Sequence, residues 1–311
     1  MRIAFIGIGA LGGYFGGRLA KAGNDVIFVA RGAMLEALRT KGLRVEGPDG
    51  DFVLPQVHAT SDPASVGHVD AIFVTTKAWQ VPDAAQQIRS MVGRETVVVP
   101  LQNGVEAYDQ LAAVLGAKHV LGGMCHVIVM VAAPGVVRHM GLTPLITIGE
   151  WNNGRTPRLD RLAECLTAAG LEVRVPENVQ VALWEKFEFI ASFGGVGGVT
   201  RAPIGVMRSV PETRSLLERA MREIVGLAHA CGVPVPDESV ATTMKFVDSL
   251  PPAGTASMQR DLIAGRPSEL EAQSGAVVRL GRARNFPTSV HEFIYNALLP
   301  GELRARGELS F

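Results

Sequence analysis

The residues best suited to chemistry near the start of the chain are glycines that follow an apolar run. Residues 3–6 lead directly into the pattern Gly7-x-Gly9-x-x-Gly12. In such a pattern the first glycine permits a tight strand-to-helix turn, the second lets the backbone approach a pyrophosphate, and the third allows close helix–strand packing. The alternative is a glycine-rich turn that binds nothing. We predict a dinucleotide site at the N-terminus of the following helix, made by Gly7, Ile8, Gly9, Ala10, Leu11 and Gly12.

The end of the second apolar run, residues 25–30, indicates which dinucleotide is bound. An NAD enzyme usually carries Asp or Glu there to hold the ribose 2′-hydroxyl. This chain instead has Arg31, and the nearest acid is Glu36. Because a guanidinium can bind a phosphate through two donors, Arg31 favours NADPH over NADH. The alternative is a solvated arginine at the start of a helix.

Polar side chains also follow two later apolar strands. Lys77 and Gln80 come after residues 70–75, and Asn103 comes after residues 95–101. In open α/β sheets, ligands bind beyond the carboxyl ends of the strands. Lys77 could therefore meet a phosphate or ribose, and Asn103 could bridge the nicotinamide ribose and a substrate. Polar residues are also common in loops after strands, so position alone does not decide.

Lys186 is a candidate proton donor in the second half of the chain. A helix would surround it with apolar neighbours three and four residues away: Ala182, Leu183, Phe189 and Ile190. Such a lysine is partly desolvated, which lowers its pKa and lets it act as an acid near neutral pH. It could equally be a surface lysine whose stem covers the stripe. We expect Glu185 and Glu188 on other faces, in solvent.

Ser257, Asp261 and Glu269 form a further polar group. Ser257 and Asp261 are four residues apart, so they share a helix face. Glu269 follows Pro267 and Ser268 at the predicted start of the next helix. A purely structural interpretation is also available, with Ser268 as N-cap and Glu269 compensating the helix dipole.

The elements that must position these residues change character along the chain. The first part alternates short apolar strands with helices, which predicts a Rossmann-type, doubly wound parallel sheet. Its expected helices cover residues 33–41, 78–92, 105–115 and 158–169. A hairpin is expected at 43–46 and 52–54, strands at 120–131 and 145–148 that extend the sheet, and a last strand at 171–175.

Beyond Pro176 the pattern becomes helical. The periodicity predicts an all-α second domain, with helices at 179–193, 210–231, 237–249, 269–285 and 289–297. We therefore divide the chain into an NADP-binding domain, residues 1–177, and a helical substrate and catalytic domain, residues 178–311. We expect the active site in the cleft between them.

Composition narrows the class of protein. The 311 residues carry 30 basic and 30 acidic side chains, so no bulk charge draws the chain to nucleic acid or an anionic membrane. The three cysteines lack metal-site spacing, which predicts no metal and a reducing compartment. No apolar stretch is long and unbroken enough to span a bilayer, and no signal peptide is apparent. We expect a soluble, cytoplasmic protein. A homodimer is compatible with the helical domain, although the sequence does not fix the oligomeric state.

Together these positions resemble the ketopantoate reductases (2-dehydropantoate 2-reductases) nearly from end to end. The resemblance rests on the glycine pattern, on Thr76-Lys77-Ala78-Trp79-Gln80, on Asn103-Gly104, on Leu183-Trp184-Glu185-Lys186, and on Ser257, Met258, Asp261, Arg266 and Glu269. It implies the fold, NADPH, and reduction of the 2-oxo group of ketopantoate to pantoate on the route to coenzyme A. It further implies that Lys186 is the acid, that Glu269 hydrogen-bonds a substrate hydroxyl and helps poise Lys186, and that Ser257 and Asn103 hold the substrate.

Three positions depart from the family pattern. Members usually carry asparagines four and eight residues after the catalytic lysine, where this chain has Ile190 and Gly194. Gly254 also stands where a further asparagine is usual. Apolar pockets discriminate weakly between substrates. The alternatives are therefore a paralogous reductase of another 2-oxo acid or an imine and, from a different class, a non-catalytic NADPH sensor.

Overall fold

The computed structural model describes residues 1–141 and 143–311, which form two compact units. The first unit contains Met1–Gln102 and Ala107–Val179, and the second contains Gln180–Phe311 together with the short segment Asn103–Glu106. The chain therefore enters the second unit for these four residues and then returns to the first.

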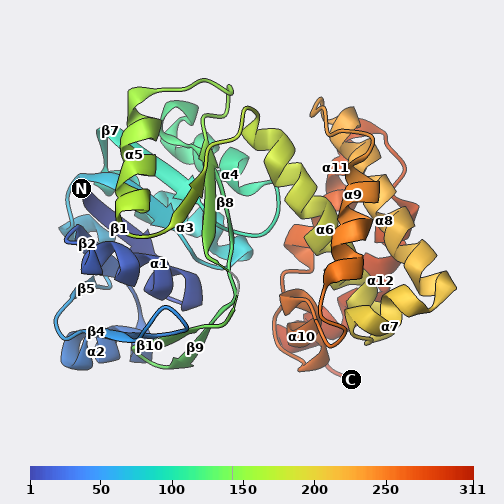
Figure 1. Cartoon of the computed structure of the whole chain (residues 1–311), viewed down its shortest axis with the longest axis horizontal. Coiled ribbons are helices and arrows are strands. Elements are labelled where there is room, and N and C mark those ends of the chain that lie inside the picture. Colours follow the sequence, from blue (N-terminus) through green and yellow to red (C-terminus); the bar gives the residue numbers. More distant parts are fainter. Residues whose placement is uncertain (142) are drawn as a thin grey trace. The chain divides into compact units, whose positions relative to one another are not determined.

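The first unit is built on a five-stranded parallel sheet with the order β5-β2-β1-β6-β7 (Figure 1). Both faces of its central strands are buried, as in doubly wound sheets. Phe5 and Phe73 stack on one face at 4.9 Å between ring centroids, and Ile6 and Val74 pack on the other. The strands are β1 (Arg2–Ile6), β2 (Asp25–Val29), β5 (His58–Thr60), β6 (Val69–Val74) and β7 (Val92–Pro100).

Helices follow the strands much as the alternating pattern predicts. They are α1 (Ala10–Lys21), α2 (Gly32–Lys41), α3 (Val81–Gln87), α4 (Ala107–Leu115) and α5 (Pro157–Ala168). The prediction of one helix over residues 78–92 was wrong, because α3 is flanked by the 3₁₀ turns Ala78–Gln80 and Arg89–Met91. Pro82 lies in the first turn of α3, where proline is tolerated. The apolar pattern of the sequence does not distinguish the 3₁₀ turns from the α-helix between them.

The predicted extension of the sheet by residues 120–131 was correct only at its start, where Val120 forms an isolated parallel bridge with Val98 of β7. This run forms two strands, β8 (Gly122–His126) and β9 (Val129–Ala133), in different sheets. β8 pairs with β11 (Leu145–Gly149) and then β12 (Glu172–Arg174). β9 pairs with β10 (Val136–His139), which continues to the predicted hairpin β3 (Leu43–Glu46) and β4 (Phe52–Leu54). An uninterrupted apolar run cannot reveal that the chain changes sheets within it.

The second unit is helical, and residues 180–311, all of which the structure describes, contain no strand. Its principal helices are α6 (Val179–Thr200), α7 (Ile204–Ser209), α8 (Pro211–Ala230), α9 (Ser239–Ser249), α10 (Ser257–Ile263), α11 (Ala276–Arg284) and α12 (Ser289–Ala305). A single apolar cluster around Phe187, Met221 and Ile294 forms its core. None of the helices in the described residues is long and apolar enough to cross a membrane.

Two helices of this unit are longer than predicted. α6 continues through the glycines at 194–198, because other side chains pack closely on it there: Gln259 Oε1 would lie 2.6 Å from a Cβ atom at Gly197. α12 continues through Pro300. Before α11 the backbone forms one π-helical turn, Glu271–Gly275, a feature often found at functional sites.

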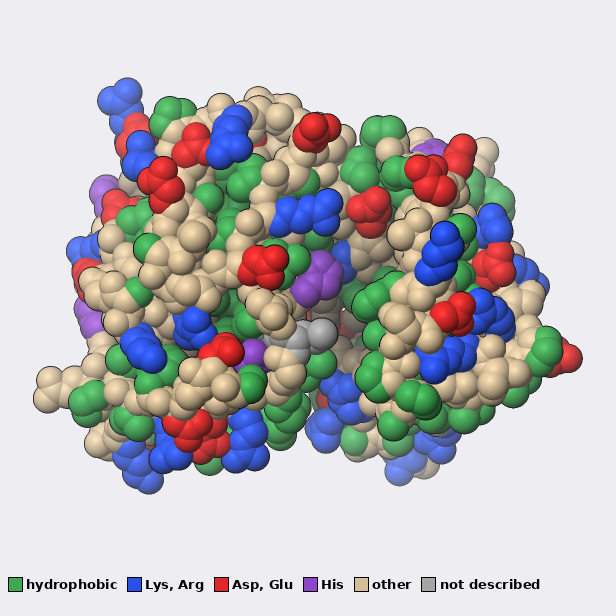
Figure 2. Space-filling model, viewed as in Figure 1, with side chains coloured by type: hydrophobic (Ala, Val, Ile, Leu, Met, Phe, Trp, Pro, Cys, Tyr) green, Lys and Arg blue, Asp and Glu red, His purple; other side chains and the backbone are tan. Residues whose placement is uncertain are grey.

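The visible surface mixes charges of both signs. On the face drawn in Figure 2, basic and acidic side chains are interspersed over each unit. This distribution agrees with the balanced composition of the sequence.

Candidate active site

The glycine turn joins β1 to α1, and two of its glycines are needed for packing within the protein. Gly7 has a φ of 88°, and a Cβ atom there would lie 2.9 Å from the Cα atom of Thr76. At Gly12 a Cβ atom would lie 2.6 Å from Thr75 Oγ1 and 2.7 Å from the carbonyl oxygen of Gly7. The hydroxyl of Thr75 donates a hydrogen bond to that same carbonyl at 2.7 Å. The turn is therefore held directly against the end of β6.

Gly9 differs, because beyond its chain neighbours no atom of the described residues lies within 4 Å of where its Cβ would be. It is the N-cap of α1, which has no side-chain cap and no acidic residue in its first turn. The positive end of the helix dipole is thus left to an external anion. The open backbone at Gly9 fits the approach of a dinucleotide pyrophosphate, with the neighbouring Ile8, Ala10 and Leu11 completing the turn.

The other predicted cofactor residues lie after neighbouring strands of the same sheet. Arg31 is exposed after β2, as the N-cap of α2, and its guanidinium donates to Gln87 Oε1 at 2.8 Å. Lys77 and Gln80 are exposed after β6, where the Lys77 backbone N–H donates to Gln80 Oε1 at 3.3 Å. Since β2, β1 and β6 are adjacent and parallel, these side chains follow the carboxyl ends of adjacent strands.

Two residues predicted on the substrate side meet directly in the helical unit. The Asn103 side-chain amide donates to Glu269 Oε2 at 3.2 Å, across 166 positions of sequence. The chain at Gly104 approaches so closely that a Cβ atom would lie 3.0 Å from the carbonyl oxygen of Ala272. Gly104 also has a φ of 118°, which favours glycine. The Asn103–Gly104 turn therefore lies against the turn that follows Glu269.

Lys186 and Ser257 belong to the same unit. Lys186 is half-buried on α6, and the expected apolar stripe is present, with Ala182 and Leu183 buried and Phe189 and Ile190 half-buried. A lowered pKa for this lysine stays a prediction. Ser257 is exposed at the first position of α10. Asp261, one turn later, forms an ion pair with Arg266 at 2.8 Å.

Glu188 contradicts the sequence prediction, which placed it in solvent. It is completely buried in the helical unit, where it accepts a hydrogen bond from the hydroxyl of Ser239. Burial raises the pKa of this carboxyl to about 7, although hydrogen bonds from Ser239 and Thr243 act in the opposite direction. Counting solvent-facing helix positions failed here because α6 packs against other helices on more than one side.

The departures at Ile190 and Gly194 lie on α6 beyond Lys186. A Cβ atom at Gly194 would lie 2.9 Å from Met258 Cε and 3.1 Å from Gln273 Oε1. These two side chains fill the space that a larger residue at position 194 would need. Gln273 is 2% exposed, and its amide oxygen has no hydrogen-bond partner within the described residues.

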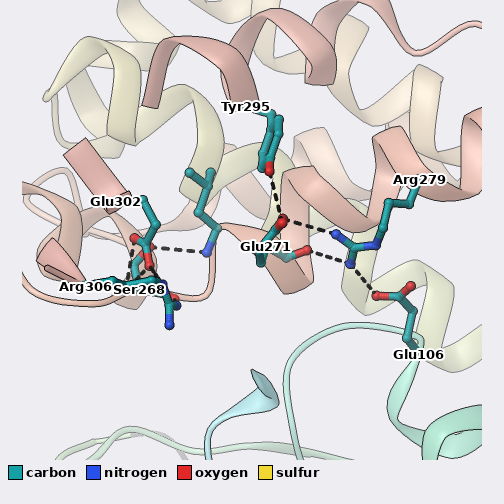
Figure 3. A network of polar contacts seen from close by, with 8 residues as sticks. Glu106, Ser268, Glu271, Arg279, Tyr295, Glu302 and Arg306 are labelled. Atoms are coloured by element: carbon teal, nitrogen blue, oxygen red, sulfur yellow. Dashed lines mark hydrogen bonds and ion pairs between the residues drawn. The ribbon is translucent and has the colours of Figure 1, made fainter. Parts of the chain in front are cut away.

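Sequence reasoning missed two polar clusters that hold the Asn103–Glu269 region (Figure 3). In the first, the buried carboxylate of Glu302 accepts hydrogen bonds from the backbone N–H and the hydroxyl of Ser268 and from Arg306. In the second, Arg279 bridges Glu106 and Glu271, and Tyr295 donates to Glu271. Their members lie up to 173 positions apart, and no local pattern in the sequence signals such pairs.

The predicted absence of a metal site is not contradicted. No cluster of three or more His, Cys, Asp or Glu side chains suited to a metal occurs in the part of the chain that the structure describes. The arrangement instead offers an anion-binding turn in one unit and an amide–carboxylate pair in the other.

Comparison with known proteins identifies the class and the family. The family model "Ketopantoate reductase PanE/ApbA" matches residues 3–153, and its C-terminal counterpart matches residues 178–302. A 2-dehydropantoate 2-reductase from Nostoc sp. is 32% identical over 279 residues, covering 88% of this chain and 86% of the relative. The crystal structure of a PanE/ApbA family ketopantoate reductase from Ralstonia eutropha is similar, with a TM-score of 0.89, 30% identity, and coverage of 98% and 100% of the two chains.

A fold neighbour with another activity is also found. The ternary structure of D-mandelate dehydrogenase with NADH and anilino(oxo)acetate has a TM-score of 0.89 at 21% identity, covering 98% of this chain and 99% of the neighbour. At that identity the likeness concerns the fold alone. The family models and the curated relatives together define an NAD(P)-dependent oxidoreductase that acts on CH–OH groups. The chain belongs to the ketopantoate reductase family.

Proposed function

We propose that the protein uses NADPH to reduce the 2-oxo group of ketopantoate to pantoate, in the biosynthesis of pantothenate and coenzyme A. The observation that carries this proposal is the hydrogen bond between Asn103 and Glu269, two residues assigned to the substrate side on independent sequence motifs. Family membership supports the reaction type, and Arg31 after β2 supports NADPH.

In this proposal the N-terminal unit holds the cofactor. Gly7 to Gly12 would bind the pyrophosphate at the start of α1, where the backbone at Gly9 is open. Arg31 would bind the 2′-phosphate after exchanging its bond to Gln87, and Lys77 and Gln80 would bind near the ribose. The bound cofactor supplies a hydride to the C2 carbonyl of the substrate.

The helical unit supplies the groups that manage charge and protons. Lys186 would stabilise the negative charge that develops on the carbonyl oxygen and then donate a proton to it. Asn103 and Ser257 would hold the carboxylate and the reacting carbonyl. Glu269 would accept a hydrogen bond from a substrate hydroxyl while its other interaction, with Asn103, fixes its direction.

A second candidate is the same chemistry on a different 2-oxo acid. Ile190 supplies an apolar side chain, and Met258 and Gln273 occupy the space beside Gly194. With Ile190 and Gly194 in place of two asparagines, the chain offers fewer polar side chains to select ketopantoate over its analogues. D-mandelate dehydrogenase was captured with such a compound, anilino(oxo)acetate.

We further propose a cytoplasmic location and a small-molecule partner only, with a homodimer as the oligomeric form to test first. Residues 1–177 would act as the NADP-binding domain and residues 178–311 as the substrate domain.

The decisive experiment is NADPH oxidation, followed at 340 nm, with ketopantoate and a panel of other 2-oxo acids, and with NADH in parallel. Efficient turnover of ketopantoate with a strong preference for NADPH is the expected result. Faster turnover of another 2-oxo acid would select the second candidate. Stoichiometric NADPH binding without turnover of any compound would instead indicate a sensor.

A further inference from the structure

The two partners of the Asn103–Glu269 hydrogen bond are held in different ways. Glu269 directly follows Ser268, which is completely buried. The carboxylate of Glu302 receives the Ser268 backbone N–H at 3.0 Å and its hydroxyl at 2.6 Å. Arg306 donates to Glu302 at 2.7 Å and to the carbonyl oxygen of Ser268 at 3.0 Å. Because both backbone polar groups of Ser268 are engaged, the chain entering Glu269 is fixed.

Asn103 belongs to the four-residue segment Asn103–Glu106, which groups with the helical unit although the chain on either side of it belongs to the first unit. Two features attach this segment to the helical unit besides the hydrogen bond itself. Val105 packs against the apolar core, and Glu106 accepts a hydrogen bond from Arg279 Nη2 at 2.8 Å. Apolar contact sets proximity but not direction, whereas a charged hydrogen bond is directional.

Arg279 connects this segment to the turn beyond Glu269. The same Nη2 atom donates to the carbonyl oxygen of Glu271 at 2.9 Å, and Nη1 donates to the Glu271 carboxylate at 3.1 Å. Tyr295 donates to the other oxygen of Glu271 at 3.0 Å (Figure 3). One guanidinium thus ties together the segment that carries Asn103 and the π-helical turn that follows Glu269.

We propose that Arg279 is a positioning residue of the active site, which sets the direction of the Asn103 amide toward Glu269. It acts through the Asn103–Glu106 segment and does not touch substrate. A lysine cannot replace it fully, because three acceptors on two segments require the planar, forked donors of arginine. This inference rests on the proposed function for its catalytic consequence, while the tether itself is a property of the free protein.

The test compares Arg279→Met with Arg282→Met. Arg282 lies on the same helix, is 71% exposed, and pairs with Glu292 at 2.9 Å, so its replacement removes a similar charge without touching the segment. The first measurement is hydrogen exchange in peptides spanning residues 101–108 of the full-length free protein. We expect faster exchange in Arg279→Met and unchanged exchange in Arg282→Met. Equal exchange in all three proteins would overturn the tether, whether or not a substrate is turned over.

The second measurement is a double-mutant cycle with Asn103→Ala, using the 2-oxo acid that the wild-type enzyme reduces best. Misplacing a substrate-binding group by about 1 Å can cost about a hundredfold in rate. We therefore expect Arg279→Met to lower kcat/KM by about ten- to a hundredfold in the wild-type background and by less than about twofold in the Asn103→Ala background. Arg279→Lys should recover part of the loss.

An equal loss in both backgrounds would show that Arg279 does not act through Asn103 and would overturn the proposal. A loss matched by Arg282→Met would do the same. Failure of the wild-type enzyme to reduce any 2-oxo acid would instead refute the proposed function, and the exchange comparison would then decide the tether alone.

Discussion

Glu188 is a carboxyl group that the helical unit buries completely, with neutral hydroxyls of Ser239 and Thr243 as hydrogen-bond donors. Its pKa in the folded protein is raised from an ordinary value of 4.5 to about 7. Between these two pH values the folded protein binds more protons at this site than the unfolded chain does. Stability therefore falls as pH rises from about 4.5 to about 7, and the loss persists at higher pH.

Replacing Glu188 with Gln should remove this pH dependence. A shift of this size corresponds to a loss on the order of 3 kcal/mol at pH 8 relative to pH 4.5. Urea unfolding can be followed through Trp184, on the same helix, in a background with Trp79→Phe and Trp151→Phe. Glu218→Gln serves as control, because the side chain of Glu218 is 39% exposed and paired with Arg222. Parallel pH profiles for Glu188→Gln and the wild type would refute the assignment.

Lys186 is the residue on which the proposed chemistry depends most. Lys186→Ala should lower kcat by about 10²- to 10⁴-fold, the usual contribution of a general acid. NADPH affinity, measured by fluorescence titration, should change little, because the proposed cofactor-binding residues other than Asn103 lie in the other unit. The exposed Lys245 offers a matched control. Turnover within a few-fold of the wild type would mean that another group donates the proton.

Single site residues could be predicted from the sequence where the residue type and its position after a strand or within a motif indicate a chemical role. Asn103 and Glu269 were predicted separately and the structure brings them together. Glu302 and Arg279 could not be predicted, because their roles depend on partners 34 and 173 positions away. Glu188 was misplaced, since a helix inside a bundle has no solvent-facing side for spacing to reveal.

Among the elements, the β1–α1 turn contains two glycines that close packing requires, Gly7 and Gly12, and one, Gly9, that we propose contacts the cofactor. Gly12→Ala should destabilise the protein by about 1–3 kcal/mol, the usual cost of overpacking, because its Cβ would meet Thr75 and the carbonyl of Gly7. Gly9→Ala should cost less, about 0.5–1 kcal/mol, because the space there is open and only the poorer N-capping of alanine remains.

The two variants should also differ in NADPH binding. Relative to the stability that each variant loses, Gly9→Ala should lose more NADPH affinity than Gly12→Ala. Gly9→Ala should weaken NADPH binding by about tenfold or more, about 1.4 kcal/mol, while lowering the melting temperature less than Gly12→Ala does. Calorimetric titration and thermal unfolding of both variants test this. An unaltered affinity in Gly9→Ala would remove the pyrophosphate from this turn.

The types and order of the strands and helices were predicted well from the sequence, but the positions where individual helices end were not. The parallel sheet and the helical second half follow from periodicity. The end of α12 did not, because Pro300 normally marks a helix boundary and here lies inside the helix. That error hid Glu302, which lies in the turn after the proline and holds Ser268.

Because the two units of the molecule have separate apolar cores, we expect NADPH binding to stabilise one unit more than the other. The N-terminal unit has apolar clusters on the two faces of its sheet, and the helical unit has its own. NADPH at a hundred times its Kd should stabilise the unit that binds it by about 2.7 kcal/mol. Hydrogen exchange should slow in peptides from β1 and α1 and change less in those from α8. Equal protection throughout would mean that both units unfold as one.

The excursion of residues Asn103–Glu106 into the helical unit also bears on inheritance. A gene fragment that ends at Val179 encodes Asn103 without Glu269, and the remaining fragment encodes Glu269 without Asn103. Recombination between related genes near codon 180 would therefore exchange the N-terminal unit. The hybrid protein would then combine Asn103 from one parent with Glu269 from the other. Productive hybrids would have to match the 103–106 segment to the helical half, so these four codons should follow the ancestry of the distant half of the gene.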